Sequence, residues 1–121
     1  MSHKNIIQIK SYQFAIRIVK LHLHLIIEKR QYDLGRQILR SGTSIGANTE
    51  EAIGAESKAD FVHKFSIAYK EARETKFWLC LLRDTDVIDN SLAESMISDC
   101  EEIIRIIGKI KQTSWENSSR N

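Results

Sequence analysis

The chain has 121 residues, no proline and five glycines, a length that fits one domain. Apolar residues make up 42% and charged residues 28%, which is a globular composition and excludes a disordered or collagen-like chain. The absence of proline argues against a loop-rich all-β fold, and no apolar run reaches the roughly 18 residues that a membrane span needs. Because no signal-peptide pattern opens the sequence, we expect a cytoplasmic protein.

Charge is distributed unevenly along the sequence. Residues 1–40 hold eight Lys and Arg against two acidic residues, a net charge of +6, whereas residues 41–121 have a net charge of −4. A basic region of this kind is typical either of an ordinary solvated helix surface or of a binding surface for polyanions. Both interpretations stay open on charge alone.

The first predicted helix runs from about Ile6 to Arg30 and carries two apolar stripes at helical spacing. We interpret the first stripe as the side that packs inside the bundle, and it consists of Tyr12, Ile16, Val19, Leu23 and Ile26. A helix with two apolar faces must bury both, so the second stripe is predicted to contact another subunit. These candidate oligomer-interface residues are Phe14, Ile18, Leu21 and Leu25.

A third side of the same helix is polar and mostly basic, and we group it with two arginines of the next segment. The candidate nucleic-acid-binding residues of this basic strip are Lys10, Arg17, Lys20, His24, Arg36 and Arg40. Contacts of this kind to phosphates give affinity without sequence choice, and the sequence offers no aromatic platform like those of single-strand binders.

Three more helices are predicted at about 32–54, 58–83 and 91–111. Residues 41–49 are small or poor helix formers, but the apolar period continues through them and favours a helix. Short connections place successive helices antiparallel, so we predict an all-α, up-down-up-down four-helix bundle over residues 1–111. The polar segment 112–121 is expected to be disordered.

No pattern of catalytic or metal-binding residues converges, so we predict a non-enzyme without metal or cofactor. The nearest approach to a di-iron motif is Asp60 with His63, which occurs once and has Asp where Glu is expected. In an antiparallel hairpin Cys80 and Cys100 are offset by roughly 9 Å, too far for a disulfide, which favours free thiols in a reducing compartment.

A polar stripe on the second predicted helix needs partners, because it lies close to the edge of the core. It consists of Ser41, Ser44, Asn48 and Glu51. The stripe is interpreted either as a hydrogen-bonded network that fixes helix register or subunit contacts, or as a binding site for a small ligand or nucleotide. Candidate partners on the third helix are Lys64, Arg73 and Lys76.

Several segments resemble a known family. Residues 37–52 resemble the second helix of the four-helix-bundle family of 23S rRNA intervening-sequence proteins, and residues 14–19, 57–61, 67–75 and 78–79 also fit that family. The resemblance covers about residues 10–111. It implies a left-handed antiparallel bundle of bacterial origin that assembles into a homopentamer. A relative, the accessory protein of diversity-generating retroelements, is a basic pentamer that binds nucleic acid and a reverse transcriptase.

Two functional hypotheses follow from the residues and the resemblance together. The first is a non-enzymatic homo-oligomer that binds nucleic acid, with structured RNA favoured, through the basic strip. The alternative is an oligomeric scaffold or accessory protein whose partner is another protein, such as a reverse transcriptase or the enzyme of a neighbouring gene. No membrane partner is expected.

Overall fold

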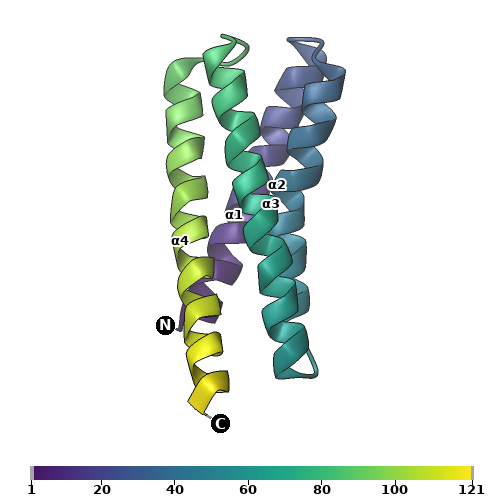
Figure 1. Ribbon diagram of the computed structural model, residues 1–121. Helices are drawn as coiled ribbons and strands as arrows, with labels where there is room; N and C mark the ends of the chain where they lie inside the picture. The colour runs from purple at the N-terminus through teal and green to yellow at the C-terminus, as the bar shows by residue number, and fades with distance from the viewer. Residues whose placement is uncertain (1, 121) are drawn as a thin grey trace.

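Four long helices make up the part of the chain that the structure describes (Figure 1). The computed structural model describes the backbone of residues 2–120 and the side chains of residues 2 and 5–114. The helices are α1 (His3–Ile27), α2 (Tyr32–Ile53), α3 (Lys58–Asp84) and α4 (Asn90–Arg120), and the described backbone contains no strand. Packing joins α1 to α2, α2 to α3, α3 to α4 and α4 back to α1. The predicted all-α four-helix bundle is therefore confirmed.

Local signals in the sequence explain where the helices begin and turn. Ser57 caps α3 by accepting a hydrogen bond from the backbone N–H of Asp60 at 3.1 Å, and Ser2 caps α1 in the same way. Arg30 and Asp86 adopt left-handed backbone conformations, with φ of 54° and 58°, in the connections after α1 and α3. The starts of all four helices lie within three residues of the predicted positions.

The end of α4 differs from the prediction. The polar segment 112–121 was expected to be disordered, yet α4 continues as a helix through Arg120. No glycine or proline interrupts residues 112–120, so nothing in the covalent chain forces the helix to stop. Asn121 lies outside the described residues.

The core reverses our assignment of the two stripes on α1. The four candidate interface residues Phe14, Ile18, Leu21 and Leu25 are 0–3% exposed and pack inside the single chain. The stripe that we expected to pack inside lies largely on the surface. The prediction that α1 has two apolar sides is correct, but the side assigned to an oligomer contact is the side that α2 and α4 already cover.

Close packing between α1 and α2 explains this orientation. A Cβ atom placed on Gly42 would lie 2.6–2.7 Å from three side-chain carbons of Ile18, which is closer than side-chain atoms approach one another. The missing side chain of Gly42 therefore makes the room that Ile18 fills. Gly35 makes room for the side chain of Ile26 in the same way. Ile26 is therefore partly buried against α2 at the edge of the core, whereas the other members of its stripe are exposed.

Candidate functional site

An exposed apolar stripe runs along α1, opposite the part of the helix that packs in the core. Its six large side chains are 41–68% exposed, and they follow one another at steps of three or four residues. We call this set the α1 stripe: Ile9, Tyr12, Ile16, Val19, Leu23 and Ile27. Such a contiguous apolar surface is typical of an interaction site, whereas single exposed apolar residues are common on any protein.

A shallow groove with a volume of about 230 Å³ lies between α1 and α2, beside the α1 stripe. Most of the side chains that line it are small: Ser11, Ala15, Thr43, Gly46 and Ala47, with Gln8, Tyr12 and Glu50 also contributing. We call it the α1–α2 groove. Because Tyr12 belongs to both features, the groove and the α1 stripe form one continuous surface.

The basic strip is largely neutralised by carboxylates. Lys10 lies 2.9 Å from Glu102 and Arg17 lies 2.7 Å from Asp99, so both of these α1 cations pair with α4. The four charged groups also line a hollow of about 200 Å³ between these helices. Ion pairs of this kind occupy the cations that we expected to face phosphates.

The two arginines of the basic strip on α2 are also paired. Arg36 pairs with Asp33 on its own helix, and Arg40 binds Glu71 at 3.1 Å and also binds Glu74. Within the described side chains, Lys20 and His24 take part in no ion pair, and they remain exposed and partly exposed, respectively. Sequence reasoning could not foresee the neutralisation, because most of the partner carboxylates lie about 30 to 90 residues away in the chain.

Glu74 is the centre of a small polar network between α2 and α3. The indole N–H of Trp78 donates a hydrogen bond to its carboxylate at 3.0 Å, and Arg40 donates a second one. The Trp78 hydrogen bond is the main reason that the pKa of Glu74 is lowered from its ordinary value, with Arg40 adding to it and partial burial opposing it. The carboxylate is thus held in its charged form.

The polar stripe on α2 forms contacts within the bundle. The buried hydroxyl of Ser41 lies 3.0 Å from that of Thr75 on α3, and Thr75 also hydrogen-bonds a backbone carbonyl of its own helix. Glu51 pairs with Lys64 of α3 at 3.3 Å, the one candidate partner that the structure brings to the stripe.

The two middle residues of the stripe bond to their own helix. The Ser44 hydroxyl donates to the carbonyl of Arg40 at 2.6 Å, and the Asn48 amide donates to the carbonyl of Ser44 at 2.8 Å. The other two expected partners, Arg73 and Lys76, are engaged with Tyr69 and Glu101 instead. These hydrogen bonds and ion pairs favour the structural interpretation of the stripe over the ligand site.

The described side chains include no group of three or more His, Cys, Asp or Glu that could hold a metal ion. Cys80 and Cys100 are free, and Cys100 is buried with its thiol directed to the carbonyl of Ala72 at 3.2 Å. Burial raises the pKa of the Cys100 thiol to about 12, so it stays protonated at neutral pH and is a poor nucleophile. Within the part of the chain that the structure describes, no helix has the length and apolarity to cross a membrane.

Comparison with known proteins finds a similar solved structure and a matching family. A solved structure from Bacteroides thetaiotaomicron VPI-5482, a protein with unknown function from the S23 ribosomal protein family, is similar to this chain at 45% sequence identity with a TM-score of 0.90. The match covers 92% of this chain and 99% of that one. No curated protein matches. The model of the 23S rRNA-intervening sequence protein family matches residues 3–109, and the chain therefore belongs to that family.

Proposed function

We propose that this protein is a non-catalytic scaffold that assembles with copies of itself, and that the α1 stripe is the contact between copies. The observation that carries the proposal is the length of the stripe. At a rise of about 1.5 Å per residue, it extends for roughly 27 Å along one side of α1. Covering the stripe with a second chain removes six large apolar side chains from water, which is the main favourable term in protein association.

The α1–α2 groove supplies a surface that suits the stripe. Small side chains such as Ala15, Thr43 and Ala47 leave the space that large side chains of a neighbouring copy fill. A stripe that fits a groove elsewhere on the same surface forms a head-to-tail contact, and repetition of such a contact closes into a ring when the rotation permits. We propose a ring of five chains, the assembly that the family resemblance implies.

We also propose that the helices of each chain run up-down-up-down. Ion pairs between neighbouring helices support this direction. Along α2, Arg40 pairs with Glu71 and Glu74, while Glu51, further along the helix, pairs with the earlier Lys64 of α3. Between α1 and α4, Lys10 pairs with Glu102 and Arg17 with the earlier Asp99. An antiparallel bundle is the arrangement that produces this inverse order.

Binding of nucleic acid through the basic strip receives less support than self-assembly. Four of its six residues are engaged by carboxylates, so a phosphate would have to displace an existing ion pair at each of them. The scaffold hypothesis needs no such exchange, because the α1 stripe is apolar and already exposed.

The test compares two variants by light scattering coupled to size-exclusion chromatography. Ile16→Glu places a charge in the middle of the α1 stripe, and Phe77→Glu places one on another exposed apolar residue, which lies on α3 outside the stripe. We expect the unmodified protein and Phe77→Glu to have the same mass, several times that of the 14.0-kDa chain, and Ile16→Glu to have a smaller one. A mass that Ile16→Glu leaves unchanged would contradict the proposal.

A further inference from the structure

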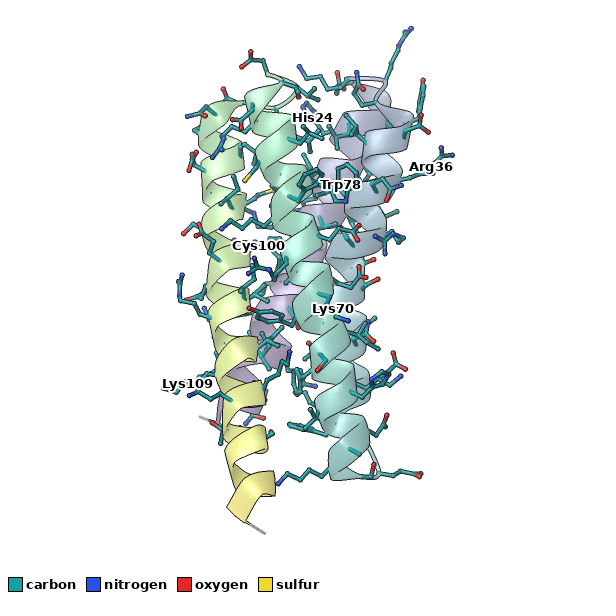
Figure 2. The ribbon with its side chains drawn as sticks, viewed as in Figure 1. His24, Arg36, Lys70, Trp78, Cys100 and Lys109 are labelled. Atoms are coloured by element: carbon teal, nitrogen blue, oxygen red, sulfur yellow. The ribbon has the colours of Figure 1, made fainter. Side chains whose placement is uncertain are left out.

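Cations without a carboxylate partner gather on α3 and α4, away from the basic strip that the sequence predicted. Within the described side chains, besides Lys58 at the start of α3, five cations of these two helices take part in no ion pair: Lys70, Arg73, Arg105, Lys109 and Lys111. Four are exposed and Lys111 is partly buried. Figure 2 labels Lys70 on α3 and Lys109 on α4. Together with Tyr69 we call them the Tyr69 cluster.

Tyr69 connects the two helices and contacts two of these cations. The Lys111 ammonium lies 4.6 Å from the centre of its ring and the Arg73 guanidinium carbon lies 5.9 Å from it, both within the range of a cation–π interaction. Gly108 faces the ring edge, where an added Cβ would lie 3.6 Å from the nearest ring carbon. Tyr69 therefore holds one cation from each helix in a fixed position.

Carboxylates close to the cluster along the helices are already paired with cations. Glu71, next to Lys70, is bound by Arg40. Glu74, one turn after Lys70, is bound by Arg40 and Trp78. On α4, Glu101 pairs with Lys76 and Glu102 pairs with Lys10. Because the one charge of Arg40 is shared by Glu71 and Glu74, one negative charge remains beside the cluster. The five cations exceed this single charge, so the described side chains leave a local excess of positive charge, in contrast to the paired basic strip on α1 and α2.

We propose that the Tyr69 cluster binds the phosphate backbone of a nucleic-acid duplex. Its cations are spread over the exposed surface of two helices, which suits a polymer with a dense, regular charge better than a small anion. A duplex carries one negative charge per about 1.7 Å of its axis. Because the contacts are charges that meet phosphates, the binding is insensitive to base sequence.

The surroundings of the Tyr69 ring favour binding of a duplex over binding of a single strand. Proteins that bind single strands offer open aromatic faces on which bases stack. The Tyr69 ring is partly buried and already has two cations over it, so it orders phosphate-binding groups instead of stacking a base. A duplex presents its phosphates on the outside and requires no stacking surface.

The experiment measures binding of the full chain to fluorescent 20-base-pair RNA and DNA duplexes of arbitrary sequence, across a range of salt concentrations. Lys70→Gln with Lys109→Gln removes two cations of the cluster. Lys29→Gln with Lys58→Gln is the matched control, because it makes the same change in net charge at two exposed lysines that take part in no ion pair and lie outside both the Tyr69 cluster and the basic strip. At roughly 0.1 M salt we expect the Kd of the cluster variant to rise at least about fivefold and that of the control to change less than about twofold.

Salt dependence and the aromatic ring provide two further readouts. The slope of log affinity against log salt should decrease by nearly two units in the cluster variant, about 0.9 for each phosphate that the variant no longer neutralises. Tyr69→Leu keeps every charge and the apolar packing but removes the ring, so we expect a Kd about two- to threefold higher, since Arg73 and Lys111 lose the cation–π interactions that position them.

Three results would overturn the proposal. The first is absence of salt-dependent duplex binding by the unmodified protein, and the second is an equal loss of affinity in the cluster and control variants, which would indicate net charge alone. The third is tighter binding to a 20-nucleotide single strand, or to a polyglutamate peptide of similar charge, than to either duplex. Preference between the RNA and DNA duplexes identifies the natural polymer without affecting the site.

Discussion

The two apolar stripes of α1 are alike in composition and spacing but lie in opposite environments. Phe14, Ile18 and Leu25 are buried in the core, whereas Tyr12, Ile16 and Leu23 face solvent on the same helix. Periodicity identifies a helix with two apolar sides but does not say which side faces the rest of the chain. The neighbouring helix decides, because α2 offers small residues such as Gly42 where the buried stripe lies.

The largest expected difference in the free energy of unfolding is between alanine variants of two leucines that lie two positions apart on α1. Leu25 is fully buried, so Leu25→Ala should lower the free energy of unfolding by about 2–5 kcal/mol through lost burial and the cavity left behind. Leu23 is exposed, and in dilute solution Leu23→Ala should change the free energy of unfolding by no more than about 0.5 kcal/mol. Urea unfolding followed by helical circular dichroism measures both. Equal losses in the two variants would mean that the assignment of the stripes is wrong.

A smaller loss of stability is expected at Gly42, which makes room for Ile18 of the buried stripe. In Gly42→Ala the new methyl group overlaps the side chain of Ile18, which should cost about 1–3 kcal/mol relative to Gly108→Ala. Gly108→Ala is the control, because its methyl group meets only the ring of Tyr69 at an ordinary distance of 3.6 Å. Combining Gly42→Ala with Ile18→Ala should cost less than the two separate losses added together, and strict additivity would show that the two positions do not compete for space.

The smallest expected change in stability concerns the side of α2 that packs on α3, where Arg40 pairs with Glu74. The lowered pKa of Glu74 means that its charge stabilises the fold above the ordinary value of 4.5 and that this stabilisation is lost as the pH falls through the folded-state pKa. Glu74→Gln should therefore be less stable than the unmodified protein near neutral pH, by up to about 1 kcal/mol for this partly exposed pair. The difference should narrow below pH 4.5.

Unfolding curves at several pH values measure this effect, and Glu56→Gln serves as the control because Glu56 is exposed in the connection between α2 and α3. The control variant should follow the unmodified protein at every pH. A difference between the unmodified protein and Glu74→Gln that stays constant with pH would show that the Glu74 charge contributes nothing to stability.

Most of the fold was predictable from the sequence, because helix formation depends on local patterns. Ser57 with Asp60 three residues later marks the start of α3, and the stripe that contains Phe65 and Leu79 lies in the core as its spacing indicates. The end of α4 was not predictable from polarity alone, since a polar segment without glycine or proline remains compatible with a helix.

The surfaces were harder to predict, because they depend on residues that are distant in the sequence. The charge asymmetry predicted a polyanion-binding surface within the first 40 residues. In the structure, however, Arg17 and Arg40 form ion pairs with carboxylates of other helices, which balance their positive charges. Conversely, the second part of the chain has a net negative charge, yet Lys70 and Lys109 remain unpaired there among the described side chains. Only the pairing across helices shows where charge is left over.

The most direct test of the self-assembly of this protein mixes two variants that are each blocked on one side of the proposed contact. Ile16→Glu disrupts the α1 stripe and leaves the α1–α2 groove intact, and Ala47→Arg fills the groove and leaves the stripe intact. By sedimentation velocity, each variant alone should have the mass of the 14.0-kDa chain, and an equimolar mixture should form a species of twice that mass, because one good contact is restored and no ring can close. A mixture that sediments as single chains, or an unmodified protein that does so at every concentration, would contradict the stripe-to-groove contact.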